Sequence, residues 1–144
     1  MKKYELTRET KVINGVELHR IKALESFGRV EKGELGGWIE SEKNLSQDGN
    51  AWVYDNAKVG GNAEVSGNAV VGESADFIVF KNWWSSCRYF TWTRSNNKWK
   101  VGCFYGSGEE LITKAYKDSE KSGREYERVV RYVESILEEE NNNK

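Results

Sequence analysis

The feature that most constrains the fold of this chain is a six-residue repeat in its middle. Asn-Ala pairs begin at residues 50, 56, 62 and 68, and Ser74-Ala75 continues the same spacing. Two residues after each alanine stands a large apolar side chain: Val53, Val59, Val65, Val71 and Phe77. A large apolar residue followed four residues later by a small one is typical of a left-handed parallel β-helix, in which three short strands form one triangular coil. We therefore expect the valines to point into the coil and the alanines to fit at its corners.

The repeat divides the chain into three segments, which are residues 1–38, 39–79 and 80–144. The middle segment is the predicted coil, and at three six-residue strands per turn it amounts to about two turns. The first segment contains Asn14-Gly15 between two apolar runs, a pattern that predicts a β-hairpin with a two-residue turn. Because a β-helix ends in an unpaired strand edge that must be covered, we expect this segment to cap the first coil.

Residues 80–144 show a different pattern. Two strands are expected at 86–94 and 98–105, with a turn between them. Ser107 and Glu110 form a capping-box pattern that predicts the start of a helix, and apolar residues at helical spacing predict a second helix over residues 123–139. The fold class is therefore mainly β: a short left-handed parallel β-helix with an N-terminal β-hairpin cap, followed by a C-terminal α+β domain of antiparallel strands and two helices.

The charge and the apolar content of the chain exclude several classes of protein. A formal net charge of -1 gives no field that would attract long nucleic acid. No apolar run is long enough for a membrane span or a signal peptide, so we expect a cytoplasmic protein that does not bind membranes. One histidine and two cysteines are too few for a structural zinc site, and we expect no metal and no cofactor. We expect Cys87 and Cys103 to be free thiols that pack as small apolar side chains.

The segment from Phe80 to Gly108 is the strongest candidate for a binding site. It contains no Asp or Glu, although the chain has 23 of these residues. It holds five basic residues and nine aromatic residues, including four of the six tryptophans. Aromatic rings stack on bases, and guanidinium groups bind phosphates in a bidentate manner. This composition therefore favours an anionic ligand with a π face.

A purely structural interpretation competes with a binding site. The aromatic side chains would then cover the two helices, and acidic residues would be missing because a buried sheet carries few charges. Alternation along the first strand separates Arg88 and Trp92 from Tyr89 and Thr91, but it does not say which face is buried. The absence of charges of one sign only favours a binding site, because a buried sheet would lose Lys and Arg as well.

Histidine chemistry is a weaker candidate. His19 stands in the hairpin segment between Glu17 and Arg20 in the sequence, which is typical of a solvated or hydrogen-bonded histidine rather than a catalytic one. No histidine lies in or after the repeat, so general-base catalysis by imidazole is excluded there.

Several stretches of the chain resemble small β-helical proteins of bacteriophages and prophages. They are the opening Met1–Thr7, the turn Gly36–Glu40 with Asn44-Leu45-Ser46 after it, and the Asn-Ala repeat. The stretch Val101–Ser107, followed by Glu110-Leu111, is similar to the strand-to-helix junction that often closes those proteins. The resemblance implies a protein that acts in the cytoplasm of a host bacterial cell.

Residues 82–92 depart from that family's pattern. A Gly/Pro-rich loop with Ser and Arg usually stands there, and of that loop only Ser86 and Arg88 persist in this chain. Many family members are called acyltransferase-like or polymer-forming because of their six-residue repeats.

Our preferred hypothesis is a non-enzymatic phage accessory protein with a counter-defence role. It would sequester an anionic immune signal of the cyclic-nucleotide type, or bind a host defence protein. The predicted ligand-binding residues combine basic groups for phosphate, a hydroxyl and tryptophans for stacking on a base. They are Trp83, Trp84, Ser86, Arg88, Trp92, Arg94 and Lys98.

Two alternatives stay open. The first is a structural module that assembles through its aromatic C-terminal sheet, and we expect a homo-oligomer. The second is an acyltransferase-like protein with six-residue repeats. Such enzymes resemble this chain only in the coil, use a histidine base at a subunit interface, and have more coils to hold the acyl carrier.

Overall fold

The N-terminal hairpin consists of β1 (Tyr4–Ile13) and β2 (Val16–Ala23) in the computed structural model, which describes residues 2–143. Asn14 and Gly15 both have positive φ, 51° and 81°, as the predicted two-residue turn requires. β2 pairs with β3 (Leu35–Ile39), and β3 pairs in parallel with β5 (Lys58–Val59) inside the repeat. The predicted hairpin is confirmed, and it belongs to a four-stranded sheet in the order β1-β2-β3-β5.

The repeat segment pairs with itself in parallel at three places. β3 pairs with β5, Leu45 bridges Val65, and β4 (Trp52–Val53) pairs with β6 (Val70–Val71). The partners are 20 residues apart at Leu45 and Val65, and 18 residues apart at Val53 and Val71. An offset of three six-residue strands is what a triangular coil requires, and the additional residues lie between Leu45 and Trp52.

The inside of this coil is filled by the repeat residues that the sequence predicts to face inward. Four valines are fully buried and four alanines are at most 3% exposed. They are Val53, Val59, Val65 and Val71, and Ala51, Ala57, Ala63 and Ala69. Asn44 is also fully buried, and its amide donates to the carbonyls of Gly61 (3.2 Å) and Ala63 (2.8 Å). These bonds satisfy buried backbone oxygens that would otherwise lack a partner.

The coil ends earlier than the repeat in the sequence. Ser74–Asp76 form a 3₁₀ turn, Ala75 is exposed, and Phe77 begins a strand, β7 (Phe77–Lys81), of a second sheet. The expectation that Phe77 is the last inward residue of a regular coil is therefore corrected. β7 pairs with β8 over five residue pairs, whereas a side of the coil is only two residues long, so the second sheet offers Phe77 the longer partner.

The second sheet is antiparallel and has the order β10-β9-β8-β7. β8 (Tyr89–Thr93) is shorter than the predicted strand at 86–94, because Cys87 has a φ of 59° and lies in a turn. The strand predicted at 98–105 is divided into β9 (Lys98–Val101) and β10 (Phe104–Gly106), because Gly102 turns the chain with a φ of 57°. Both cysteines are exposed free thiols, so the expectation that they pack in the interior is wrong.

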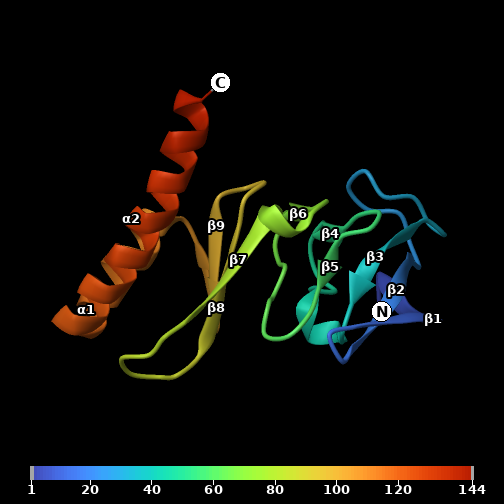
Figure 1. Cartoon of the computed structure of the whole chain (residues 1–144), viewed down its shortest axis with the longest axis horizontal. Helices are drawn as coiled ribbons and strands as arrows, with labels where there is room; N and C mark the ends of the chain where they lie inside the picture. The colour runs from blue at the N-terminus through green and yellow to red at the C-terminus, as the bar shows by residue number, and fades with distance from the viewer. Residues whose placement is uncertain (1, 144) are drawn as a thin grey trace.

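Two helices cover one face of this sheet (Figure 1). The predicted capping box opens α1 (Gly108–Asp118): the Glu110 N–H donates to Ser107 Oγ (3.2 Å), and the Ser107 N–H donates to Glu110 Oε1 (2.9 Å). α2 (Glu120–Asn142) begins before the predicted residue 123. Within residues 2–143, no helix is long and apolar enough to cross a membrane.

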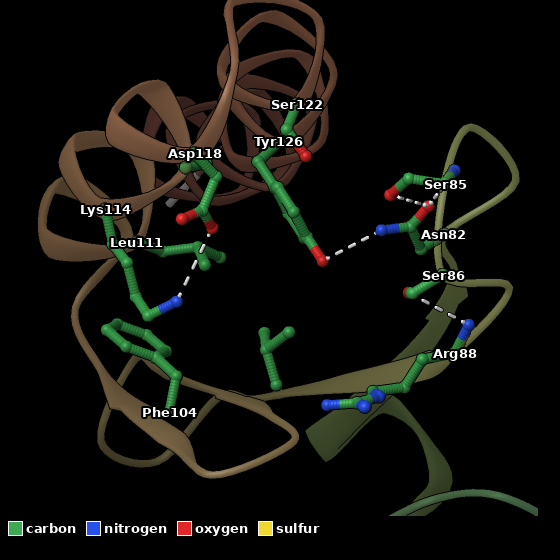
Figure 2. A pocket seen from close by; sticks show the side chains of 12 residues that line it. Asn82, Ser85, Ser86, Arg88, Phe104, Leu111, Lys114, Asp118, Ser122 and Tyr126 are labelled. Carbon is green, nitrogen blue, oxygen red and sulfur yellow. Dashed lines mark hydrogen bonds and ion pairs between the residues drawn. The ribbon is translucent and has the colours of Figure 1, made fainter.

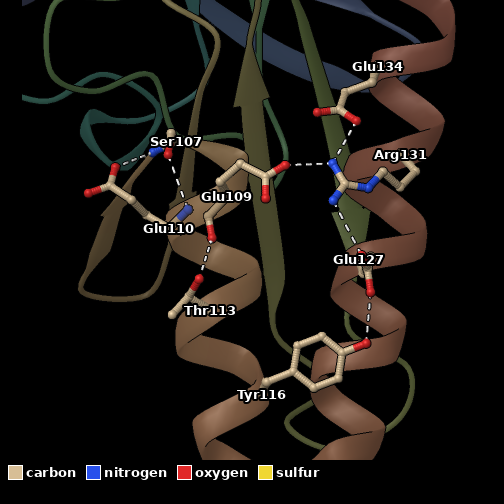
Figure 3. Close-up of polar contacts among 8 residues, drawn as sticks. All are labelled: Ser107, Glu109, Glu110, Thr113, Tyr116, Glu127, Arg131 and Glu134. Atoms are coloured by element: carbon tan, nitrogen blue, oxygen red, sulfur yellow. Dashed lines mark hydrogen bonds and ion pairs between the residues drawn. The ribbon is translucent and has the colours of Figure 1, made fainter.

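Arg131 of α2 holds the two helices together through three carboxylates (Figure 3). Its guanidinium donates to Glu109 of α1 (2.6 Å), and to Glu134 (2.8 Å) and Glu127 (3.3 Å) of α2 itself. Glu127 also accepts from the hydroxyl of Tyr116 on α1 (2.8 Å). The helix pair therefore presents one rigid surface to the loop that connects β7 and β8.

The opposite face of the second sheet closes the far end of the coil. Three hydroxyl side chains of this sheet and its turn contact backbone groups of the last coil segment. They are Thr91 with the N–H of Glu64 (3.0 Å), Ser95 with the N–H of Val70 (2.8 Å), and Tyr105 with the carbonyl of Ser66 (3.2 Å). The coil thus lies between the N-terminal sheet and the C-terminal sheet, and both of its ends are covered (Figure 1).

Candidate functional site

A pocket of about 210 Å³ lies between the loop at residues 82–88 and the two helices (Figure 2). Its polar lining comes from two sources. The loop supplies Asn82, Ser85, Ser86 and Arg88, and the helices supply Lys114, Asp118, Ser122 and Tyr126. Apolar side chains of β9, β10 and α1 form the remaining walls.

Asn82 organises the loop that forms one side of this pocket. Its side chain is buried, and its Oδ1 accepts from the backbone N–H groups of Trp84 (3.1 Å) and Ser85 (2.9 Å) and from the Ser85 hydroxyl (3.3 Å). Its Nδ2 donates to the hydroxyl of Tyr126 on α2 (3.2 Å). One buried amide therefore fixes both the turn of the loop and its position against the helix.

Trp84 holds the same loop from behind. Its ring packs edge-on against Tyr126, with centroids 4.8 Å apart, and its Nε1 donates to Ser122 Oγ (3.0 Å). Trp84 therefore positions the pocket wall rather than lining it.

Arg88 carries an unpaired positive charge at the pocket. In the part of the chain that the structure describes, no carboxylate lies within 4.0 Å of its guanidinium. The guanidinium lies against Gly102, where an added Cβ would come within 2.0 Å of Arg88 Nη1. Glycine at this position therefore makes room for the arginine side chain.

Lys114 supplies a second cation on the opposite side of the pocket (Figure 2). Its ammonium lies 3.6 Å from Asp118, one helical turn further along α1. With Arg88, Lys114 and Asp118 charged, the lining carries a formal net charge of +1. An anion is the ligand that this lining favours.

Burial raises the pKa of Tyr126, and the hydrogen bond from Asn82 only partly opposes this effect. The phenol therefore keeps its proton at neutral pH, and its oxygen points to the pocket between the loop and the helices (Figure 2). A neutral hydroxyl of this kind can donate a hydrogen bond to a bound anion.

The structure brings together only some of the seven residues predicted from the sequence. Ser86 and Arg88 line the pocket, and Trp84 supports it. Trp83 is 63% exposed on the same loop, with the Lys121 ammonium 5.4 Å from its ring centroid. Trp92 is fully buried in the second core, so its ring is not available to stack on a ligand.

The other two predicted residues lie away from the pocket. Arg94 pairs with Glu140 near the end of α2, and its Nε donates to the carbonyl of Ala75 (3.1 Å). Lys98 begins β9 opposite Thr93. The expectation that Arg88, Arg94 and Lys98 hold one phosphate together therefore lacks the required geometry.

Four lining residues were not predicted from the sequence: Asn82, Lys114, Ser122 and Tyr126. Tyr126 was assigned only to the buried stripe of its helix, and it is buried. In residues 2–143, no three His, Cys, Asp or Glu side chains are arranged to hold a metal ion.

No protein-family model matches the chain. A stretch of 63 residues is 40% identical to YdcK of Escherichia coli K12, which is named an uncharacterized acetyltransferase. The match covers 38% of this chain and 19% of YdcK, so the chain spans about a fifth of the length of this relative. Together with the six-residue spacing, the partial match suggests a hexapeptide-repeat family.

Proposed function

We propose that this protein binds a small ligand through a phosphate group and does not act as an enzyme. The observation that carries this proposal is the unpaired guanidinium of Arg88 in a pocket that also contains Lys114 and free hydroxyl groups. Charge-assisted hydrogen bonds of this kind are among the strongest that a protein makes to a phosphate. His19, which lies on β2 of the N-terminal sheet, does not line the pocket.

The specific role that we propose is counter-defence in a phage or prophage setting. The protein would sequester an anionic immune signal of the cyclic-nucleotide type, or bind a host defence protein. The likeness to phage proteins and the clustering of aromatic and basic residues after Phe80 support this role. Trp83, exposed on the pocket loop, is the tryptophan left to stack on a base.

A thermal-shift screen tests the binding function. The ligands are inorganic phosphate, AMP, 3′,5′-cyclic AMP, and cyclic di- and trinucleotides, because a ligand that binds only the folded state raises the melting temperature. Arg88→Ala should abolish the shift. Arg29→Ala is the matched control, since Arg29 is another exposed arginine in the described residues with no carboxylate within 4.0 Å, and it lies outside the pocket.

Two results would contradict the binding function. One is an equal shift in the wild type and Arg88→Ala, which would place the ligand elsewhere. The other is the absence of any shift, and with a concentration-dependent mass in light scattering this would favour an assembly module that forms homo-oligomers.

An acetyltransferase is the second candidate function, and the partial match to YdcK favours it. Acetyl coenzyme A also carries phosphates, so binding alone does not separate the two functions. We expect acetyl coenzyme A to bind without transfer or hydrolysis of its acetyl group. Release of free coenzyme A that is lost in Arg88→Ala would contradict the non-enzymatic proposal.

We also infer that the coil is a left-handed β-helix of the hexapeptide-repeat type. The offset of 18 residues between Val53 and Val71, and the buried valines and alanines, support this assignment. An experimental crystal structure that shows a right-handed coil would overturn it.

A further inference from the structure

The pocket contains three hydroxyl groups whose oxygens each accept a hydrogen bond from the protein. The pairs are Ser86 Oγ with the backbone N–H of Arg88 (3.2 Å), Ser122 Oγ with Trp84 Nε1 (3.0 Å), and Tyr126 Oη with Asn82 Nδ2 (3.2 Å). The donors come from the backbone, from an indole and from a buried amide. All three hydroxyl groups line the pocket.

In residues 2–143, none of these three hydroxyl groups donates its own proton to a protein acceptor. A hydroxyl has one proton to donate, and an N–H directed at its oxygen turns that proton away from the donor. The burial of Tyr126 makes the choice acute there, because a buried donor without a partner is costly. The three protons are therefore available to a group inside the pocket.

Ser85 provides the contrast on the same loop. It lines the same pocket, but its hydroxyl donates to Asn82 Oδ1 (3.3 Å). Its proton is already used within the protein. Two adjacent serines thus differ in what they can offer to a ligand.

From this geometry we propose that Ser86, Ser122 and Tyr126 donate hydrogen bonds to the bound phosphate, in addition to Arg88 and Lys114. The pocket is then a donor site that selects a group with acceptor oxygens only. Asn82 and Trp84 are positioning residues, because their N–H groups orient two of the three hydroxyls. This inference rests on the proposed function, and it names the chemistry that the same pocket recognises.

Asp118 is consistent with such a donor site. It lines the pocket as an acceptor, but the ammonium of Lys114 lies 3.6 Å from its carboxylate. Both residues lie on α1, so the pair stays on one side of the pocket (Figure 2). The hydroxyl groups come from the loop and from α2, and they leave the other side free of negative charge.

Isothermal titration calorimetry with three related probes tests this proposal. AMP carries a phosphate monoester, 3′,5′-cyclic AMP carries a diester, and adenosine carries no phosphate. We expect the two phosphates to bind and adenosine not to bind. The ratio between AMP and cyclic AMP identifies which form of phosphate the site prefers.

Single variants then separate the hydroxyl groups. Ser122→Ala and Tyr126→Phe each remove one donor to a charged group and should weaken binding of the preferred phosphate about tenfold. Ser85→Ala is the matched control, and it should change the affinity by less than about twofold. Circular dichroism checks that each variant is folded, and if Tyr126→Phe does not fold, Ser122→Ala decides.

The outcomes distinguish this inference from the proposed function. If Arg88→Ala abolishes binding while Ser122→Ala and Tyr126→Phe bind as well as the wild type, the donor set is wrong and the phosphate site stands. If Ser85→Ala weakens binding as much as Ser122→Ala does, the distinction between free and used protons is wrong. If neither phosphate binds to the wild type, the proposed function fails and the donor set fails with it.

Discussion

The hydroxyl oxygen of Thr91 accepts a hydrogen bond from the backbone N–H of Glu64 at 3.0 Å, and this contact joins the second sheet to the open edge of the coil. Thr91 is only 1% exposed, so no water can replace it easily. A short coil exposes unpaired backbone groups at its end, and a side chain from the neighbouring sheet satisfies one of them. The stability of the coil therefore depends on the C-terminal part of the chain.

Thr91→Val tests this dependence. Valine keeps the shape of threonine but leaves the N–H of Glu64 without a partner, which should lower the free energy of unfolding by about 1 to 3 kcal/mol. Thr113→Val, at an exposed position of α1, is the control and should change it by about 0.5 kcal/mol or less. Urea denaturation measures both values. Equal losses in the two variants would show that Thr91 does not support the coil.

Lys3 gives the fold a pH dependence at alkaline pH. Its ammonium donates to the carbonyls of Ala51 (2.8 Å) and Gly49 (3.1 Å), and burial lowers the pKa of Lys3 from 10.5 to about 8. Between these two values the unfolded chain binds more protons than the folded chain, so the free energy of unfolding rises with pH. Burial also raises the pKa of Tyr4 above its usual 10.0, so stability falls again as pH rises past that value.

We therefore expect the midpoint of urea denaturation to increase from pH 8 to a maximum near pH 10. Lys3→Met removes the titrating group and should make the curve flat over that interval, even though the variant is less stable at every pH. Parallel curves for the wild type and Lys3→Met would contradict this assignment.

Gly102 and Gly61 form a pair that separates backbone strain from displacement of Arg88. Both have positive φ, 57° and 60°, but only at Gly102 would a Cβ meet Arg88. Alanine at either position should cost about 1 kcal/mol of stability, because L residues disfavour this conformation. Only Gly102→Ala should also weaken phosphate binding. Equal binding by the two variants, measured by calorimetry, would show that Gly102 does not position Arg88.

Asn44 is the buried polar residue on which the coil depends most. Asn44→Asp replaces a group that donates to two carbonyls with a carboxylate that repels them. We expect a loss of about 3 kcal/mol in the free energy of unfolding at neutral pH. Asn62→Asp, at an exposed position of the same repeat, should have little effect. A similar loss in both variants would indicate a general intolerance of the repeat to negative charge.

The sequence predicts the coil well because burial there depends on local spacing. Val53, Val71 and the alanines between them are buried as the period requires. The same period fails at Phe77, where it continues for one more step although the chain has already left the coil. The competing partner of Phe77 is β8, and no local pattern reveals a pairing across that distance in the sequence.

The candidate site could be predicted only in part. Alternation correctly separates the faces of β8, since Phe90 and Trp92 lie in one core while Thr91 faces the coil. It cannot show that the helices cover Trp92 and leave Arg88 open. Lys114 and Tyr126 reach the pocket from helices far along the chain, and such contacts depend on how the helices pack on the sheet.

Chemical-shift mapping by ¹⁵N–¹H NMR tests the central claim, a phosphate site at Arg88, most directly. The protein is titrated with the phosphate probe that gives the largest thermal shift, and Arg88→Ala is titrated in parallel. We predict changes confined to residues 82–88, to the turn around Gly102 and to the facing parts of α1 and α2, and no changes in Arg88→Ala. Changes confined to the Arg94 and Glu140 end of the molecule, or changes that persist in Arg88→Ala, would contradict the account.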